Sequence, residues 1–150
     1  MLKIRIAQAE DLESVVAMMN GGASSQRVHL ESGGVGRYEP AFLDIQMCPN
    51  TDIYVGEVEE GVCVATFQLT YVKGLAFNGM ARAQIESMHT RADMRGKGLG
   101  KQMLAFAVEL ARANGCCMVQ LTSHKEREDA HRFYSSNGFV PTHEGFKLIL

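Results

Sequence analysis

Residues 95–101 have the composition of a phosphate-binding loop, with the sequence Arg-Gly-Lys-Gly-Leu-Gly-Lys. Glycine lacks the side chain that would hold a backbone amide away from an anion, and it adopts positive φ where a turn needs it. From about Gly98 the sequence indicates the first turn of a helix, whose unpaired amides and dipole favour negative charge. Arg95, Lys97 and Lys101 would add charge-assisted hydrogen bonds. The segment therefore predicts a site for a pyrophosphate group.

Two common phosphate-binding motifs do not fit this loop. A Walker loop requires glycine five residues before its Gly-Lys pair, but arginine lies five residues before Gly100, and glutamine follows Lys101 where serine or threonine is needed. A Rossmann fingerprint that starts at Gly96 would require glycine at position 101. The spacing that fits is Arg-x-x-Gly-x-Gly, formed by Arg95, Gly98 and Gly100 between a predicted strand and a predicted helix.

A second pattern lies in the last third of the chain, where Ala130, Tyr134, Gly138 and Phe139 have the spacing Ala-x-x-x-Tyr-x-x-x-Gly-Phe. The glycine-rich loop followed by this pattern resembles the GNAT superfamily of acetyl-CoA-dependent N-acetyltransferases. The similarity is to its small-metabolite branch and extends in part to aminoalkylphosphonate N-acetyltransferases. The resemblance implies acetyl-CoA as co-substrate and a small-molecule amine as the other partner.

The resemblance also implies which residues hold the cofactor: the end of a strand, the glycine-rich loop and one aromatic side chain. The expected cofactor-binding residues are Met88, His89, Thr90, Arg95, Gly96, Lys97, Gly98, Leu99, Gly100, Lys101 and Phe133. One position departs from the family pattern. Many members have asparagine three residues before the alanine of the second motif, in contact with the pantetheine arm, and this chain has Arg127 there.

Glu86 occupies the position of the general base in this resemblance. It could accept the proton of the attacking ammonium directly or through a water, because a carboxylate in a cleft titrates closer to neutrality than a free one. The alternative is a structural carboxylate that pairs with Arg82 or another base, since ion pairs perturb carboxylates as well.

Tyr134 is the candidate general acid. A phenol with a pKa near 10 is protonated at neutral pH and can hydrogen-bond the thiolate that leaves. The alternative is an aromatic residue packed beside Phe133 and Phe139, and the match to the family spacing favours the acid.

Backbone amides around Met88 and His89 are the expected donors to the tetrahedral oxyanion, because main-chain dipoles fixed in a strand need little reorganisation. His89 is also an alternative base, although a regular strand would place it on the face opposite Glu86. His143 could contact the substrate, but a lone histidine there is more often a surface residue.

Hydrophobic periodicity supplies the elements that position these residues. Strands are expected at residues 2–6, 52–58, 62–72, 81–90, 116–122 and 147–150. Helices are expected from Leu12 to the Gly21-Gly22 pair and at residues 40–47, 99–114 and 128–137. Strand 81–90 has one unusually polar face, with Arg82, Gln84, Glu86 and Met88, which suggests that this face lines a cleft.

Strand 81–90, helix 99–114 and strand 116–122 form a predicted parallel βαβ unit, and cofactors bind at the carboxyl ends of such strands. The predicted fold class is therefore α+β, with a GNAT-like mixed, largely antiparallel sheet and helices on both faces. The Gly- and Ser-rich segment 23–39 is either a substrate lid or a flexible surface connection.

Length and charge narrow the functional classes. The 150 residues fit a single domain over residues 1–150, and a net charge of −2 with both signs interspersed argues against broad attraction to nucleic acid or anionic lipid. No apolar run approaches the length of a membrane span, and no signal-peptide pattern is present, so a cytoplasmic protein is expected.

The four cysteines, Cys48, Cys63, Cys116 and Cys117, show no metal-binding spacing and are expected to be reduced core residues. The histidines lack a His-Glu-x-x-His pattern, so no structural or catalytic metal is expected.

The predicted function is transfer of acetyl from acetyl-CoA to a primary amine of a small molecule, by direct attack in a ternary complex. Two alternatives stay open: acetylation of protein N-termini or lysines, and a non-catalytic module that binds acyl-CoA. A homodimer is plausible from the resemblance alone.

Overall fold

A computed structural model describes residues 2–23 and 25–150 of the chain, with backbone only for residues 25 and 26. The chain divides into two compact units, Met1–Gln120 and Leu121–Leu150, which we describe separately. The division of the chain into domains is not decided by this packing, so a single domain over residues 1–150 stays a prediction.

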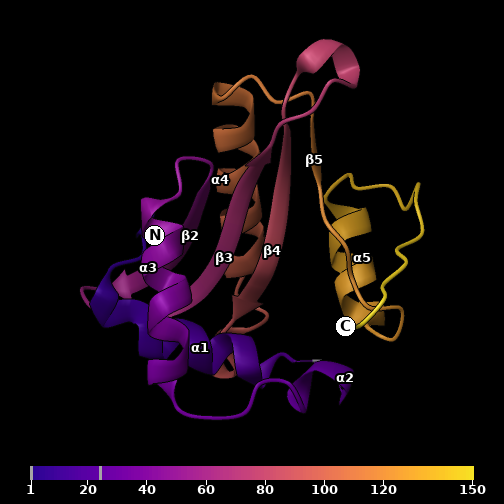
Figure 1. The fold of residues 1–150 in the computed structure, drawn as a ribbon. Helices are drawn as coiled ribbons and strands as arrows, with labels where there is room; N and C mark the ends of the chain where they lie inside the picture. Colours follow the sequence, from indigo (N-terminus) through magenta and orange to yellow (C-terminus); the bar gives the residue numbers. More distant parts are fainter. Residues whose placement is uncertain (1, 24) are drawn as a thin grey trace. The chain divides into compact units, whose positions relative to one another are not determined.

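The first unit is built on a five-stranded sheet in the order β1-β2-β3-β4-β5 (Figure 1). The strands are β1 (Lys3–Ile6), β2 (Thr51–Glu59), β3 (Val62–Val72), β4 (Arg82–Thr90) and β5 (Met118–Gln120). Successive pairs are antiparallel except β4 and β5, which are parallel and joined through a helix. The mixed, largely antiparallel sheet and the βαβ unit are confirmed.

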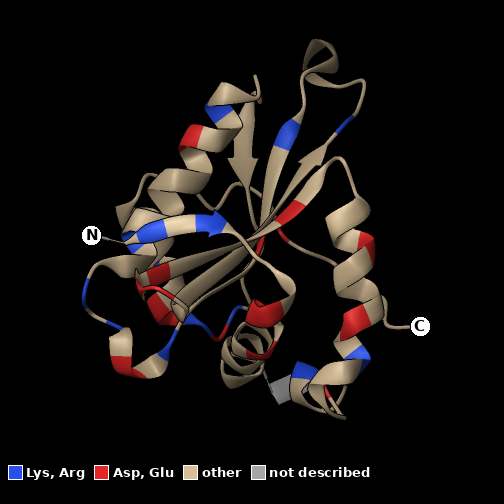
Figure 2. Ribbon diagram, turned by 90° about the vertical axis from the view of Figure 1, so that its left-hand side faces the viewer, with Lys and Arg blue, Asp and Glu red and all other residues tan. Residues whose placement is uncertain are grey.

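The α-helices are α1 (Leu12–Gly21), α2 (Ser25–Val28), α3 (Glu39–Met47), α4 (Leu99–Ala113) and α5 (Glu128–Ser136). Short 3-10 turns are η1 (Ala9–Asp11), η2 (Val35–Tyr38), η3 (Phe77–Gly79) and η4 (Ala92–Met94). Helix α5 belongs to the second unit and all others to the first. None of the described helices is long and apolar enough to cross a membrane. Lys, Arg, Asp and Glu are interspersed along the elements of both units (Figure 2).

Helices cover both faces of the sheet because adjacent strand residues point in opposite directions. On β2, Val55 belongs to the core cluster that includes Val15 of α1 and Phe42 of α3. The neighbouring Gly56 faces the other way, where an added Cβ would meet Leu2 and the sulfur of Met103 on α4. Helices α1 and α3 therefore pack on one face, and α4 packs on the other.

A buried ion-pair network joins β1, η1, β2 and β3 beneath α1. The Arg5 guanidinium donates to both oxygens of Asp11 at 2.6 and 2.9 Å, and to Glu57 through Nε at 2.9 Å. The Gln8 amide and the Cys63 thiol also donate to Asp11. These partners offset the cost of burying the two carboxylates.

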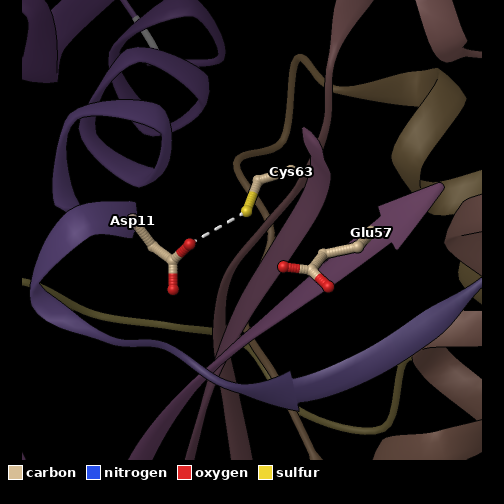
Figure 3. Close-up of side chains that lie close together, drawn as sticks. All are labelled: Asp11, Glu57 and Cys63. Atoms are coloured by element: carbon tan, nitrogen blue, oxygen red, sulfur yellow. Dashed lines mark hydrogen bonds between the residues drawn. The ribbon is translucent and has the colours of Figure 1, made fainter. Parts of the chain in front are cut away.

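Asp11, Glu57 and Cys63 offer ligand atoms that all lie within 4.8 Å of one another (Figure 3). Arg5 already holds the pKa values of both carboxyl groups below their usual range, and burial raises the pKa of Cys63 to about 12. The thiol is thus a hydrogen-bond donor and not a thiolate ligand. The cluster is satisfied by an arginine, so we assign it a structural role.

Three details differ from the sequence predictions. Residues 147–150 form no strand, because a strand needs a hydrogen-bonded partner strand and none of the described residues pairs with them. The last strand of the sheet is only Met118–Gln120. Of the four cysteines, Cys63 alone is buried, and the other three are half-buried because they lie just outside the strands and helices expected to cover them.

Candidate active site

Strand β4 is interrupted by a β-bulge at the position of the candidate base. Glu86 pairs with Gln68 of β3 and His89 pairs with Thr66, so Ser87 and Met88 together lie opposite a single residue, Phe67. Ser87 has φ of 49°, which is rare for a residue with a side chain. A bulge of this kind bends the strand and redirects the side chains that follow it.

The bulge places His89 on the same face as Glu86. Residues directly opposite one another in a sheet share a face, and Thr66 and Gln68 are two apart on the regular strand β3. The prediction that His89 faces away from Glu86 was therefore wrong, because it assumed a regular strand. His89 is buried while Glu86 is exposed.

Among the described strands, none pairs with β4 beyond Gln84 on the β5 side. The pairing with β5 ends at Gln84 and Gln120, whose side chains share a hydrogen bond of 2.7 Å, while β4 continues to Thr90. The Arg91 amide donates a hydrogen bond to the Val64 carbonyl of β3. Because successive amides point to opposite edges, those of Met88 and Thr90 point away from β3, and that of His89 points towards it. Of the two expected oxyanion donors, only Met88 thus has its amide on this edge.

The glycine-rich loop ends in an uncapped helix N-terminus. Gly98 is the N-cap of α4 with φ of +75°, and no side chain caps the helix. The first helical bond runs from Gln102 to the Gly98 carbonyl at 3.2 Å, which leaves the amides of Leu99 to Lys101 without intrahelical acceptors. A Cβ at Gly96 or Gly98 would meet nothing within 4 Å, so the space beside these two glycines is open.

The basic residues of the loop are arranged around this N-terminus. Arg95 Nε donates to the Thr90 carbonyl at 3.2 Å, which ties the loop to the end of β4. Lys97 and Lys101 are exposed. The side chain of Leu99 is buried in the core, so its contribution to an anion site is its amide alone. Residues 88–101 thus run without interruption from the end of β4 through the loop into the first turn of α4, and their binding of the cofactor stays a prediction.

Glu86 lies neither in the buried cleft nor in the structural ion pair that the two sequence interpretations proposed. Its side chain is exposed, so the expected burial in a cleft is absent from the unit described here. It accepts a hydrogen bond from Gln68 Nε2 at 3.2 Å. Among the described residues no base, Arg82 included, lies within ion-pair distance of it. The expected structural ion pair is therefore not seen.

The C-terminal end of α1 meets the bulged part of β4. A Cβ at Gly22 would lie 2.4 Å from Nδ1 of His89, so the backbone reaches its position only because residue 22 is glycine. The same helix end holds the following segment: Arg27 donates to the Met19 carbonyl at 2.7 Å, and Asn20 donates to the Tyr38 hydroxyl at 3.4 Å. The Gly21-Gly22 pair was predicted only to end the helix, because local sequence carries no signal for a contact with a residue as distant as His89.

In the second unit, α5 carries Tyr134 between two aromatic rings. The ring centroids of Phe133 and Phe139 lie 5.2 and 5.7 Å from that of Tyr134, both edge-on. Burial raises the pKa of Tyr134 above its ordinary value, and the positive charge of Arg127 opposes the shift. Among the described residues the hydroxyl has no hydrogen-bond partner. Tyr134 is therefore both packed and protonated, so its two interpretations are compatible.

Two other predicted positions lie in this unit. Arg127 is the N-cap of α5 and accepts the first helical bond from His131 at 3.0 Å. His143 is exposed and shares a hydrogen bond of 2.7 Å with Thr142, in keeping with a surface residue.

Family and sequence comparisons both match this chain to N-acetyltransferases. The model of the Acetyltransferase (GNAT) family matches residues 24–139. An aminoalkylphosphonate N-acetyltransferase from Salmonella typhimurium is 38% identical over 67 residues, which are 45% of this chain and 44% of that protein. An uncharacterized N-acetyltransferase, YhdJ of Bacillus subtilis, is 45% identical over 57 residues, 37% of this chain and 40% of that protein. The chain thus matches less than half the length of these curated relatives.

Solved structures show the same fold. A protein from Bacillus halodurans C-125 described as a transcriptional regulator superposes with a TM-score of 0.91 and 34% identity, over 100% of both chains. Glucosamine-6-phosphate N-acetyltransferase from Arabidopsis thaliana has a TM-score of 0.80 at 21% identity, over 99% of this chain and 98% of that one, which supports the fold alone. The family uses acetyl-CoA, in agreement with the predicted co-substrate. The chain belongs to the acetyltransferase (GNAT) family.

Proposed function

We propose that this protein transfers acetyl from acetyl-CoA to the primary amine of a small molecule, by direct attack of the amine in a ternary complex. The observation that carries the proposal is the segment 88–101, where the end of β4 beyond its pairing with β5 leads through a basic loop into the uncapped N-terminus of α4. Such a segment suits a long ligand with amide groups at one end and a pyrophosphate at the other. The named activity of the Salmonella relative supports a small-molecule acceptor.

In this mechanism the first unit binds the donor and prepares the amine. The Met88 amide donates to the oxyanion as the amine nitrogen bonds to the acetyl carbon. Glu86, exposed beside Gln68, takes the ammonium proton directly or through a water. His89 is a second candidate for that role, because the bulge places it on the same face.

The tetrahedral intermediate then releases coenzyme A by cleavage of its carbon–sulfur bond. Tyr134 donates its phenolic proton or a hydrogen bond to the leaving sulfur, a role that its raised pKa suits at neutral pH. No acyl-enzyme is needed, and the buried thiol of Cys63, already a donor to Asp11, is a poor nucleophile. A homodimer stays a prediction from the family.

The test is incubation of the purified protein with acetyl-CoA and a panel of small primary amines, followed by release of free thiol and by the mass of the product. An increase of 42 Da in an amine, matched to thiol release, is expected from the mass of an acetyl group that replaces hydrogen. Acetylation of protein or peptide substrates without any small amine would contradict the proposal.

A second candidate is a regulatory module that binds acetyl-CoA without turnover. It is favoured by one observation, the description of the Bacillus halodurans neighbour as a transcriptional regulator. The same assay separates the two, because the module would bind acetyl-CoA and release no thiol with any amine.

Replacement of Gly98 by leucine is expected to weaken acetyl-CoA binding severely, by about 100-fold or more, because a large side chain would occupy the open space at the N-cap of α4, where the pyrophosphate is proposed to bind. Calorimetric titration of acetyl-CoA measures the effect. Gly61→Leu is a matched control, since Gly61 also has φ of +75° and open space around its Cβ but lies in the β2–β3 turn. Equal affinities in both folded variants would refute the anion site.

Replacement of Gly22 by alanine is expected to raise KM for the amine about 10-fold and to leave acetyl-CoA affinity within twofold, because the new Cβ displaces His89 or the segment after α1. Gly21→Ala is the control: its Cβ would meet nothing within 4 Å. Steady-state kinetics with each substrate varied in turn gives both values. An identical response of the two variants would show that the Gly22–His89 contact has no part in acceptor binding.

A further inference from the structure

A hollow of about 230 Å³ lies in the segment between α2 and α3 of the first unit. It is lined by Leu30, Glu31, Ser32, Arg37 and Tyr38. The segment 23–39 was predicted to be either a substrate lid or a flexible connection. Its described residues from 27 onward include the end of α2, all of η2 and several side-chain hydrogen bonds, and both interpretations stay predictions.

The negative charge in the hollow is already paired. The Tyr38 hydroxyl donates to Oε2 of Glu31 at 2.5 Å, and Nε of Arg27 lies 3.4 Å from the other carboxylate oxygen. The guanidinium of Arg27 also donates to the Met19 carbonyl, which fixes it at the end of α1. Glu31 is therefore neutralised by the protein itself and does not attract a cation into the hollow.

The positive charge of Arg37 is not paired in this way. Its Nη1 donates to the Ser32 carbonyl at 3.2 Å, and among the described residues no carboxylate lies within ion-pair distance. Its aliphatic stem packs on the backbone of Gly33, where an added Cβ would lie 2.2 Å from Arg37 Cδ. The Arg37 side chain is thus held by its aliphatic stem against Gly33 and by Nη1 on the Ser32 carbonyl. Its other guanidinium N–H groups are available to a ligand.

We propose that this hollow binds the anionic group of the acceptor, a phosphonate, phosphate or carboxylate carried on a small primary amine. A guanidinium matches the geometry of such oxyanions with two parallel hydrogen bonds, and the hydroxyl of Ser32 adds a polar group. The inference rests on the proposed function, because it assigns the hollow to the acceptor of that reaction.

Contacts link the hollow to the candidate active site. Tyr38, at its wall, accepts a hydrogen bond from Asn20 in the last turn of α1. The next residues of the same helix end lead to Gly22, whose backbone lies against His89 on the face of β4 that also carries Glu86. The end of α1 therefore contacts both the wall of the hollow and the bulged part of β4.

The kinetic test uses three amines that share the chain H₂N–CH₂–CH₂–X: 2-aminoethylphosphonate, β-alanine and n-propylamine. Arg37→Gln is expected to lower kcat/KM about 10-fold for the first two and less than twofold for propylamine, the modest loss reflecting an exposed guanidinium. Arg37→Lys, which keeps the charge without the planar fork, is expected to recover part of the loss for phosphonate. The ratio of the two anionic substrates distinguishes a phosphonate site from a carboxylate site.

Arg112→Gln is the matched control, because it removes an equal charge from an exposed arginine that pairs with Glu109 on α4. It should leave all three substrates unchanged. An equal loss for propylamine and 2-aminoethylphosphonate in Arg37→Gln, or no loss for either anionic amine, would overturn the proposal.

A binding measurement separates failure of the inference from failure of the proposed function. Methylphosphonate is titrated into the wild-type protein and Arg37→Gln without acetyl-CoA, and amide chemical shifts of residues 30–38 are followed. Shifts that depend on Arg37, in a protein that acetylates no amine, would retain the anion site and reject the acetyltransfer. Normal acetyl transfer with no shifts in residues 30–38 would reject the anion site and retain the function.

Discussion

Replacing Tyr134 with phenylalanine is expected to lower kcat by about 10²–10⁴ and to leave acetyl-CoA affinity close to that of the wild type. The ring stays packed between Phe133 and Phe139, so the fold of α5 should be retained. The hydroxyl lacks a partner among the described residues, so its removal breaks no hydrogen bond of the resting protein. Pre-steady-state and steady-state kinetics beside calorimetry measure the two quantities.

The pH dependence provides an independent check on Tyr134. Because burial raises the pKa of this phenol above that of a free tyrosine, its acid form persists to higher pH, and activity is expected to fall only in the range where the raised pKa is reached. Tyr71→Phe is the control, since its hydroxyl accepts a hydrogen bond from Asn114 at 2.9 Å and has no role in the proposed reaction. A change confined to KM in Tyr134→Phe would make Tyr134 a binding residue.

Replacing Glu86 with glutamine is expected to remove most of kcat/KM at neutral pH, while the protein folds and binds acetyl-CoA. Activity should recover as pH rises towards the pKa of the amine, because the neutral nucleophile is then supplied by solution. The measurement is a pH–rate profile of both proteins from about pH 6 to pH 10, with the acidic limb reporting the essential base. The change in melting temperature should be small, because Glu86 is exposed and has one hydrogen bond, to Gln68.

Glu109→Gln is the matched control for Glu86, since it removes an exposed carboxylate that pairs with Arg112 on α4. An acidic limb that survives in Glu86→Gln would eliminate Glu86 as the base. His89→Gln should then be tested, because His89 shares the face of Glu86, whereas the regular-strand prediction had ranked it lower.

Much of the fold could be predicted because it follows from periodicity and from glycine. The β2–β3 hairpin, α4 and the parallel β4–α4–β5 unit appear within a few residues of their predicted bounds. Local sequence governs these elements: a turn at Gly61, a helix N-terminus after Gly98, and an apolar stripe that faces the sheet. The position of the glycine-rich loop before α4 was predictable for the same reason, since its residues are contiguous; its binding of the cofactor stays a prediction.

The side-chain orientation beyond the bulge could not be predicted. Nothing in the residue type of Ser87 indicates positive φ, and the extra residue reverses the face of every later position on β4. The error about His89 follows directly. The expected strand at 147–150 failed for a different reason: residue type favours extended backbone, but a strand also needs a hydrogen-bonded partner strand, which local sequence does not specify.

Contacts between residues far apart in the sequence could not be predicted either. Gly22 meets His89, and Arg5 joins Asp11 to Glu57, across sequence separations that no local pattern encodes. In the alternating segment 2–6, Arg5 would be assigned to solvent, whereas it lies in the network beneath α1. Polar residues buried in pairs are therefore where sequence reasoning about this chain is weakest.

The end of β4 that β5 does not pair has a consequence for the handling of the protein. Unpaired amides and carbonyls on a strand can pair with a strand of another molecule, which is a common origin of aggregation. A ligand that occupies the same groups competes with that association and stabilises the fold in proportion to RT ln(1 + [L]/Kd). Acetyl-CoA would thus act as a protective additive, and solubility on storage should depend on whether the protein is purified with it.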